Sequence, residues 1–481
     1  MSPWRWAGIA VSSVAVAASL TGYTYYRNLD AGIVRENVEP GLGADRPPET
    51  GALNVLLVGS DSREGENKRY GATSQGLGER TDTIMMLHIS PNRDQAVMIA
   101  FPRDSMVLVP ECVKPGGGTI PGGTRQINAA FNDGGIACTI RTIESLTNIH
   151  VNHFVKVDFT GFKSVVDALG GIEICLPKAV SDPQAKLVLS AGKHVVNGEQ
   201  ALGYVRTRYK LGDGSDLSRI QRQQVFLSKV LAKVTDGDLL GSPDKLDDFL
   251  GAATSAVTVD SALTLHRMLD IANSVKGLTA KELKGITVPV QPYPADTNRV
   301  QFRQPDAQNF FDSVRRDVEV TSTTSSSPSA APKIKNEQVR VQVLNGTATK
   351  GMAKQVADEL AAQGFVVTQL GNVAEAARTT IRYRGKDAEG PAYAEAVASR
   401  LSKDKRTPTA GKVKPLTSEA YAGTAAATPA ATPAAGPAAG PAAGPVVQLV
   451  IGADWPGVRV LSAIPGSLKD KVIDTTTNPC L

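Results

Sequence analysis

Three short apolar runs constrain the fold of the first half of this chain. They cover residues 53–58, 83–89 and 96–101. A run of this length without alternating polar positions is typical of a strand that is buried on both faces. Residues 155–159 and 172–176 predict further strands, and the apolar spacing between them predicts a helix at residues 160–169. Strands that alternate with helices predict an α/β layered domain.

The chain of 481 residues is too long for one ordinary core, so we expect more than one domain. The α/β domain would span residues 51–318. A Ser/Thr/Pro-rich linker at residues 319–336 would lead to a small α+β domain at residues 337–465. Within that second domain, Ala/Gly/Pro repeats at residues 417–445 predict a low-complexity insertion, because they contain nothing to bury. Residues 466–481 would form a tail.

The N-terminal segment has no charged residue between Arg5 and Arg27. As a helix, residues 7–26 would extend about 30 Å, which is enough to cross a bilayer. Tryptophans stand before this stretch and tyrosines close it, as expected at the two membrane interfaces. The sequence therefore predicts a cytoplasmic stub at residues 1–6, a single transmembrane helix, and a tether at residues 27–50.

A cleaved signal peptide is the alternative to an anchor. Ala15-Val16-Ala17 resembles a cleavage site behind a short apolar core. Whether the N-terminal segment is an anchor or a cleaved signal peptide, the bulk of the chain is expected to be extracytoplasmic. An anchor would hold it at the cell membrane. The net charge of only +5 and the absence of a basic helix-turn-helix give no reason to infer nucleic-acid binding.

The four cysteines include no C-x-x-C pair, so a zinc site is disfavoured. An even number fits disulfides in a chain that lies outside the cytosol. Cys112 and Cys138 bracket a Gly-rich loop and are the candidate pair. Cys175 lies in a strand-like run. It is either a buried free thiol or the partner of Cys480.

Charged residues stand at the boundaries of the three apolar runs. Asp61 follows the first run, Arg80 and Asp82 precede the second, and Arg103 follows the third. The carboxyl ends of buried strands are where α/β sheets bind ligands. One such residue is usually a solvated loop charge. Charges at three successive strand boundaries favour a site.

A second charged cluster lies more than a hundred positions later. Residues 197–205 predict a short capped helix that leads into Arg206 and Arg208. If this piece is extended, both arginines point to the same side. Two adjacent guanidinium groups favour a bound anion, although two solvated arginines are the simpler interpretation.

The following helix adds polar residues to this cluster. Asp216 is a plausible N-cap, and Arg219 and Gln223 lie three and seven positions later on the same face. Arginine donates bidentately to phosphate oxygens, and Mg²⁺ binds carboxylates, waters and phosphate oxygens. Paired aspartates with several arginines are therefore the composition expected of a metal–diphosphate site. The sequence contains no P-loop and no G-x-S-x-G nucleophile motif.

At this point the residues resemble a known family, LytR–CpsA–Psr. Six segments resemble its signature blocks in order: residues 54–63 (NVLLVGSDSR), 80–85 (RTDTIM), 101–105 (FPRDS), 126–132 (QINAAFN), 197–208 (NGEQALGYVRTR) and 215–224 (SDLSRIQRQQ). The second domain, with Leu344-Asn345-Gly346 after its first strand, resembles the LytR-type C-terminal domain of actinobacterial members.

The resemblance implies a membrane anchor and a three-layer α/β/α domain with an apolar groove for a polyprenyl tail. It implies a phosphotransferase of cell wall biogenesis, a glycopolymer–peptidoglycan ligase. The enzyme would move a glycopolymer phosphate from a polyprenyl-pyrophosphate carrier to a peptidoglycan hydroxyl. A pyrophosphatase side activity would also fit. Arabinogalactan and teichoic acid both fit, with the composition favouring the former. The implied partners are the lipid-linked glycan, peptidoglycan and the membrane.

The resemblance also assigns roles residue by residue. Asp61 and Asp82 would hold Mg²⁺ or Mn²⁺. The expected pyrophosphate ligands are Arg80, Arg103, Arg206, Arg208, Arg219 and Gln223. The expected catalytic residues are Arg103, Arg206, Arg208 and Asp216, and Asp216 would orient an arginine or move a proton. The alternative is a non-catalytic, membrane-anchored binder of lipid-linked glycan that recruits a partner enzyme.

Overall fold

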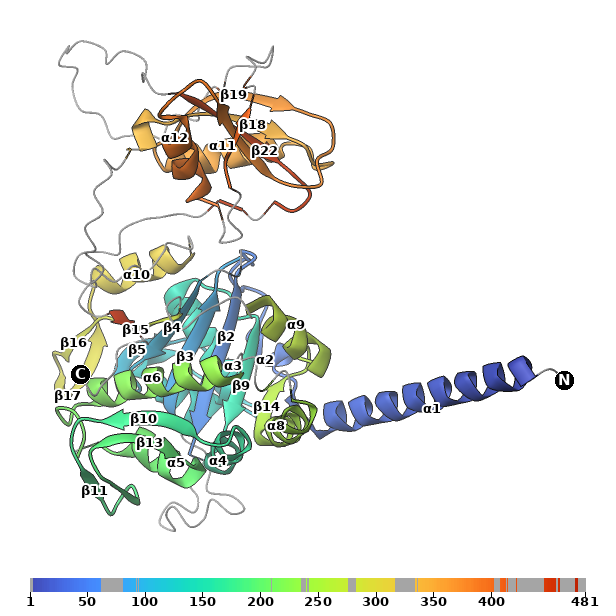
Figure 1. Cartoon of the computed structure of the whole chain (residues 1–481). Coiled ribbons are helices and arrows are strands. Elements are labelled where there is room, and N and C mark those ends of the chain that lie inside the picture. Colours follow the sequence, from blue (N-terminus) through green and yellow to red (C-terminus); the bar gives the residue numbers. More distant parts are fainter. Residues whose placement is uncertain are drawn as a thin grey trace. The chain divides into compact units, whose positions relative to one another are not determined.

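A computed structural model shows two compact units in the chain (Figure 1). The first unit comprises Met1–Arg315 and Pro465–Leu481, and the second comprises Arg316–Ile464. The structure describes residues 3–61, 81–91, 93, 95–208, 210–234, 239, 242–275, 283–315, 334, 336–401, 407–411, 413, 421, 445–455, 457–458 and 472–474.

A mixed sheet of eight strands forms the centre of the first unit. In spatial order its strands are β1 (Val34–Glu36), β14 (Val257–Asp260), β9 (His153–Val157), β2 (Leu53–Ser60), β3 (Thr81–Ile89), β4 (Ala96–Phe101), β15 (Leu283–Thr287) and β23 (Val472–Asp474). The three apolar runs of the sequence coincide with β2, β3 and β4. Strand β3 is antiparallel to both of its neighbours, whereas β9 and β15 run parallel to β2 and β4.

Helices and short strands surround this sheet. The helices are α1 (Pro3–Gly32), α2 (Glu39–Leu42), α3 (Ile127–Thr147), α4 (Phe159–Ala168), α5 (Gly198–Arg206), α6 (Asp216–Val234), α8 (Pro243–Ala256), α9 (Leu265–Val275) and α10 (Asp306–Arg315). The outer strands are β5 (Ser105–Val109), β6 (Cys112–Val113), β7 (Thr119–Ile120), β8 (Gly123–Gln126), β10 (Ile172–Leu176), β11 (Val180–Asp182), β12 (Leu187–Leu189), β13 (Gly192–Val196), β16 (Val290–Tyr293) and β17 (Asp296–Phe302).

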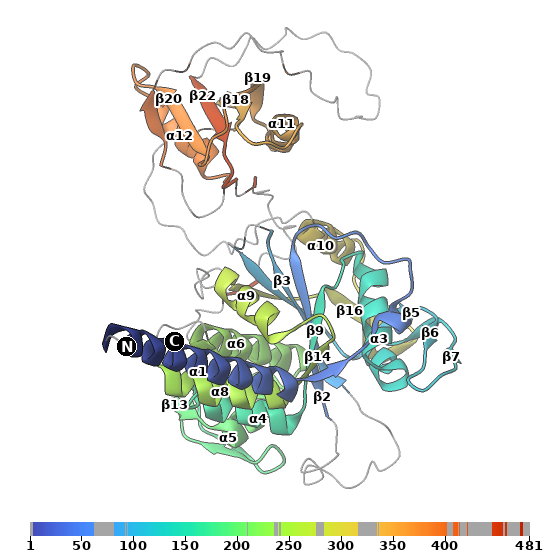
Figure 2. The ribbon, with the colours of Figure 1, turned by 90° about the vertical axis from the view of Figure 1, so that its right-hand side faces the viewer.

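Helices cover both faces of the main sheet, with α6 and α3 on opposite sides (Figure 2). On the α6 side, Ile220 belongs to the same buried cluster as Met98 of β4. On the other side, Phe101 of β4 stacks on Phe311 of α10 with ring centroids 6.3 Å apart. Because successive residues of a strand point to opposite faces, a strand covered on both faces must be apolar throughout.

Residues 27–50, predicted as a tether, are part of the fold. Strand β1 pairs in parallel with β14, and Arg46 binds the buried Glu144 at 2.8 Å. Three apolar side chains of this stretch are buried: Ile33, Val38 and Leu42. The tether prediction was wrong because these widely spaced apolar residues find core positions although Pro, Gly and charged residues surround them.

The predicted transmembrane segment, residues 7–26, falls inside the long helix α1. No helix in the described part of the chain is both long enough and apolar enough to cross a membrane. The C-terminal end of α1 contacts other helices of the first unit, since Tyr25 hydrogen-bonds Asp247 of α8. Asp30 also accepts a hydrogen bond of 3.1 Å from the backbone N–H of Leu265, at the start of α9.

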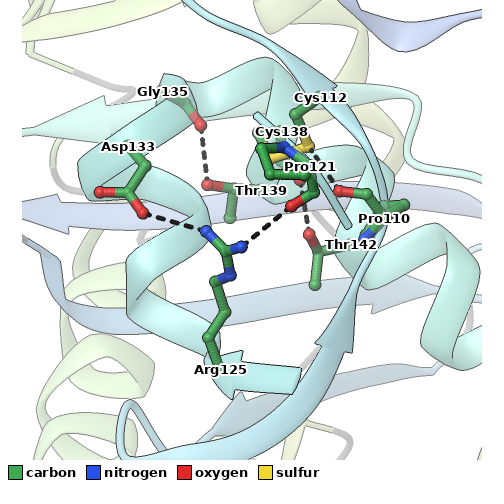
Figure 3. The surroundings of a disulfide bond; sticks show 9 residues. All are labelled: Pro110, Cys112, Pro121, Arg125, Asp133, Gly135, Cys138, Thr139 and Thr142. Atoms are coloured by element: carbon green, nitrogen blue, oxygen red, sulfur yellow. Dashed lines mark hydrogen bonds and ion pairs between the residues drawn. A yellow bond between two sulfur atoms is a disulfide. The ribbon is translucent and has the colours of Figure 1, made fainter. Parts of the chain in front are cut away.

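A disulfide between Cys112 and Cys138, the candidate pair, joins β6 to helix α3 (Figure 3). Close by, Arg125 of β8 donates a 2.9 Å hydrogen bond to the carbonyl of Pro121 and lies 3.5 Å from the carboxylate of Asp133 in α3. Strands β6 and β8 are therefore each linked to α3, the first by the disulfide and the second by the ion pair between Arg125 and Asp133.

Cys175 lies in β10, which matches the predicted strand at residues 172–176. Its side chain is buried and its sulfur takes part in a disulfide, which excludes the free thiol considered from the sequence. Cys480, the other partner considered, lies outside the described residues.

The second unit is a five-stranded sheet with two helices on one face. In spatial order the strands are β19 (Val366–Asn372), β18 (Arg340–Asn345), β22 (Val446–Ile451), β20 (Thr380–Arg384) and β21 (Thr409–Gly411). Helices α11 (Met352–Ala362) and α12 (Gly390–Ala398) supply Val356, Leu360 and Val397 to a core shared with Val341 and Leu449. The chain then returns to the first unit, because β23 pairs with β15.

Candidate active site

Two aspartates lie at one edge of the main sheet, as the strand pattern predicted. Strand β2 ends at Ser60, which pairs with Thr81 at the start of β3. Asp61 and Asp82 directly follow these paired residues, so they stand at neighbouring strand ends. The side chain of Asp82 is 47% exposed, which leaves this carboxylate accessible from solvent.

Arg103 reaches the same edge from the loop after β4. Its guanidinium group forms an ion pair with Asp82 and lies 3.4 Å from Asp104. Gln126, at the end of β8, donates a 2.9 Å hydrogen bond to the other oxygen of Asp104. Strand β8, which pairs with β5, therefore helps to position Arg103 through Asp104.

The first turn of α6 holds the second charged cluster. The Asp216 carboxylate lies 3.1 Å from Arg208 and 2.5 Å from Arg219. Asp216 is the first residue of the helix rather than its N-cap, so that prediction was wrong by one position. Its carboxylate is engaged by two arginines, and Arg219 is only 4% exposed. The Nε of Arg219 has no hydrogen-bond partner among the described residues.

The two clusters form one electrostatic group. Burial alone lowers the pKa of Arg103, but the charges of Asp82, Asp104 and Asp216 together raise it above its ordinary value. Burial lowers the pKa of Arg219, and the positive charges of Arg103 and Arg208 lower it further against the opposing effect of Asp216. A buried guanidinium group beside other guanidinium groups favours a bound anion.

Gln223 joins strand β3 to helix α6. Its side-chain oxygen accepts a hydrogen bond of 3.4 Å from the hydroxyl of Thr83, and its amide donates to the carbonyl of Val205 at 3.2 Å. Gln223 is 8% exposed. The structure therefore places Gln223 where the sheet edge, α5 and α6 meet.

Arg206 is the last residue of helix α5, so the extended conformation considered for this piece does not occur at Arg206. The helix starts with a capping box between Asn197 and Gln200 and remains helical through Arg206. The guanidinium group of Arg206 lies 4.6 Å from the ring centroid of Phe159, the first residue of α4. Arg80, the remaining predicted arginine, lies outside the described residues.

Arg222, in helix α6, is a further functional candidate. Its guanidinium group donates to the carbonyls of Tyr204 and Leu211, at 3.0 and 3.4 Å, and to that of Thr207. These bonds hold the segment that carries Arg208. The signal available in the sequence was an arginine one position before Gln223.

The carboxylates of Asp61 and Asp82 are the candidate ligands of a divalent cation. No group of three or more His, Cys, Asp or Glu side chains suited to a metal occurs in the described part of the chain. Asp61 and Asp82 nevertheless fit Mg²⁺, which commonly takes one or two carboxylates and fills its shell with water and phosphate oxygens. Such a cation would compete with Arg103 for Asp82.

Comparison with known proteins identifies the family of the chain. The family model described as the LytR_cpsA_psr family matches residues 21–321. The chain belongs to this family. A second model, described as LytR cell envelope-related transcriptional attenuator, matches residues 338–455. The first match contains every candidate site residue of the first unit, and the second match covers most of the second unit.

Two curated relatives and one solved structure illustrate the range of similarity. The cell wall biosynthesis protein LcpA of Corynebacterium glutamicum is 28% identical over 400 residues, which are 76% of this chain and 76% of LcpA. The polyisoprenyl-teichoic acid–peptidoglycan teichoic acid transferase TagV of Bacillus subtilis is 26% identical over 49% of this chain and 59% of TagV. A LytR-Csp2A-Psr enzyme from Actinomyces oris aligns with a TM-score of 0.45 at 22% identity, over 59% of this chain and 95% of that one.

Proposed function

We propose that the first unit transfers a glycopolymer phosphate from a polyprenyl-pyrophosphate carrier to a hydroxyl of peptidoglycan. The observation that carries this proposal is the single electrostatic group made by Arg103, Arg208 and Arg219 with Asp82 and Asp216. A diphosphate is a compact multiple anion, and arginine forks match its oxygens. The family membership and the teichoic acid transferase name of TagV support the same reaction class.

The arginines would bind and polarise the pyrophosphate. Arg219 is buried, with its Nε unpaired among the described residues, so a phosphate oxygen would supply the missing partner. When the substrate binds, Arg103 would give up part of its ion pair with Asp82 and bind a phosphate oxygen instead. Asp216 would keep Arg208 and Arg219 oriented. Preorganised charges of this kind stabilise the charge that develops on the transferring phosphoryl group.

The reaction needs no covalent intermediate on the protein. The acceptor oxygen would form a bond to the glycan-proximal phosphorus while the P–O bond to the polyprenyl phosphate breaks. Polyprenyl phosphate would leave, and the hydroxyl proton would pass to a carboxylate of the site, with Asp216 as our candidate, or to solvent. Water in place of the wall hydroxyl would give a pyrophosphatase side reaction.

Asp61 and Asp82 would hold Mg²⁺ or Mn²⁺ at the sheet edge. When bound, the cation would supply charge neutralisation to the phosphate oxygens. The chain's own contribution is to fix the two carboxylates at the ends of adjacent strands. Removal of divalent cations with EDTA should lower transfer by at least about 10²-fold, and Mg²⁺ should restore it.

We also propose that the protein acts at the outer face of the cell membrane, held by α1. Along α1 the side chains of Trp4, Val14, Leu20 and Tyr23 are more than half exposed, so they are available to a lipid phase. Membrane fractionation of cells that express the intact chain tests this placement. Recovery of the protein in the soluble fraction would contradict it.

The competing function is binding of the lipid-linked glycan without catalysis. The ion pairs inside the site fit a binding protein as well as an enzyme. Purified protein should be incubated with the lipid-linked donor, a peptidoglycan acceptor and Mg²⁺. Metal-dependent release of polyprenyl phosphate, lost in Arg208→Ala, supports transfer. Tight donor binding without release in the intact protein would favour the binder.

A further inference from the structure

Thr207 lies between two of the proposed pyrophosphate ligands, Arg206 and Arg208. It is only 1% exposed, whereas the side chain of Arg208 is 37% exposed. The N–H of Thr207 donates to the carbonyl of Gly203 at 2.9 Å and completes helix α5. Its ψ of 136° then turns the chain out of the helix. The conformation of Thr207 therefore sets the direction in which Arg208 leaves α5.

Asp182, at the end of β11, binds the side chain of Thr207. The Thr207 hydroxyl donates to one carboxylate oxygen of Asp182, which lies 25 positions earlier in the chain. The other oxygen accepts hydrogen bonds of 3.0 and 3.1 Å from the backbone N–H groups of Gln184 and Ala185, in the turn between β11 and β12. Asp182 is 8% exposed. One buried carboxylate therefore joins this turn to the end of α5.

The β11–β12 hairpin also packs directly on helix α5 (Figure 1). A Cβ atom built on Gly203 of α5 would lie 2.7 Å from the carbonyl oxygen of Ala185, which is closer than a side chain tolerates. Val180 and Leu187 of the hairpin belong to the same buried cluster as Tyr204 of α5. The hairpin is therefore a fixed support for the carboxylate of Asp182.

The backbone of Thr207 is held from helix α6 as well. The guanidinium group of Arg222 donates to the carbonyl of Thr207. The N–H, the carbonyl and the hydroxyl of Thr207 are thus bound by α5, α6 and β11 respectively. Buried polar groups that are all paired in this way fix a single conformation.

The contact between Asp182 and Thr207 is a hydrogen bond to a charged group. Burial raises the pKa of Asp182, but the hydrogen bonds from Thr207, Ala185 and Gln184 and the charge of Lys210 lower it more, so the net pKa lies below the ordinary value. Hydrogen bonds to an ionised carboxylate are stronger than those between neutral groups. The contact is therefore suited to hold Thr207 firmly.

We propose that Asp182 is a positioning residue of the transfer reaction, which acts through Thr207 on Arg208. The proposal rests on the function proposed above. The side chain of Arg208 is oriented by Asp216 at 3.1 Å, and its backbone is oriented by Thr207. Bidentate binding of phosphate by arginine depends on orientation as well as charge, and a misplacement of about 1 Å can cost about 10²-fold in rate.

The rate of polyprenyl phosphate release by the intact chain tests the proposal, with a polyprenyl-pyrophosphate-linked disaccharide as the donor. Thr207→Val removes the hydroxyl, keeps the size of the side chain and leaves the turn bonds of Asp182 in place. It should lower kcat/KM by about 10-fold or more, and Asp182→Ala should lower it at least as much. Thr207→Ser keeps the hydroxyl and should restore most of the activity. Ser181→Ala, at an exposed position in β11, is the matched control and should keep full activity.

A variant of Arg208 separates positioning from a purely structural role. Lysine binds phosphate as a point charge, so its contact depends less on orientation than that of the arginine fork. In an Arg208→Lys background, Thr207→Val should therefore lower kcat/KM by less than about threefold further. A purely structural role of Thr207 predicts the same loss in both backgrounds.

Three results would overturn the proposal. In the first, Thr207→Val keeps its activity within about twofold of the unchanged protein. In the second, the losses of Thr207→Val and Arg208→Lys multiply. In the third, Thr207→Ser loses as much as Thr207→Val.

The affinity of the same proteins for the donor keeps this test separate from that of the proposed function. An unchanged protein that binds the donor and releases no polyprenyl phosphate would contradict transfer. The same set of variants, read as donor Kd, would then still decide the role of Asp182. Weaker binding by Thr207→Val that depends on Arg208 would support positioning, and unchanged binding would contradict it.

Discussion

The carboxylate of Asp216 lies 2.5 Å from the guanidinium group of Arg219, three positions later in helix α6. The same carboxylate holds Arg208 at 3.1 Å, so one acidic group orients two of the proposed pyrophosphate ligands. Asp216→Asn preserves the shape and removes the charge. We expect transfer to fall by about 10²-fold. Asp244→Asn, at an exposed position in α8, is the matched control and should keep full activity.

Phe159 positions Arg206 through its ring. The guanidinium carbon lies 4.6 Å from the ring centroid, and such contacts contribute about 0.5–2 kcal/mol. Phe159→Leu should lower kcat/KM by about 2- to 30-fold, whereas Phe159→Tyr should restore most of the activity. Equal losses in both variants would show that the ring's packing, rather than its π face, is what the site needs.

The Cys112–Cys138 disulfide closes a segment with a sequence separation of 26. Loop-closure entropy predicts that this crosslink stabilises the fold by about 3.5 kcal/mol. The double variant Cys112→Ser/Cys138→Ser should lose that amount in chemical unfolding followed by circular dichroism. The comparison must be made without reductant, because Cys175 is also in a disulfide. A loss below about 1 kcal/mol would mean that Arg125 and the packing around α3 already fix the hairpin.

Asp260 should make stability depend on pH. Its burial raises its pKa, but hydrogen bonds from His153 and from the backbone N–H groups of Phe154 and Ala262 lower it more, so the net pKa lies below the ordinary value. A depressed carboxyl pKa stabilises the fold above the unfolded pKa of about 3.9, and this is lost as pH falls through the folded value.

Unfolding free energies of the intact protein and Asp260→Asn, measured from pH 7 to pH 3, test this dependence. The variant should be less stable by about 1–3 kcal/mol at pH 7, and the difference should shrink below about pH 4. A difference that stays constant across this range would assign the effect to hydrogen-bond geometry rather than to charge.

The sequence predicted the buried strands well because their burial leaves a local signature. Strands β2, β3 and β4 are covered on both faces, so their residues are mainly apolar. Two buried polar residues within them, Asn54 and His88, hydrogen-bond each other at 2.7 Å. The start of α5 could also be predicted from local sequence. Asn197 and Gln200 lie three positions apart and form hydrogen bonds with the free backbone N–H groups at the start of the helix. The charged residues at the sheet edge followed directly from these strand positions.

Features that depend on distant contacts could not be predicted. The sequence around Arg46 contains no pattern that predicts its hydrogen bond to Glu144, 98 positions later. Residues 27–50 were therefore predicted to be a tether. The meeting of Thr83 with Gln223 depends on how α6 packs on the sheet. The return of β23 to the first unit likewise depends on pairing with β15, and three residues give too short a pattern to indicate it.

The central claim is that Arg103 and Arg219, from segments more than a hundred positions apart, act on one pyrophosphate. A double-mutant cycle of Arg103→Ala and Arg219→Ala, measured as kcat/KM for polyprenyl phosphate release, tests it most directly. Each single variant should lose about 10²-fold, and the double variant should lose much less than the product of the two, because groups that act as a unit are not additive. Losses that multiply would contradict a shared site.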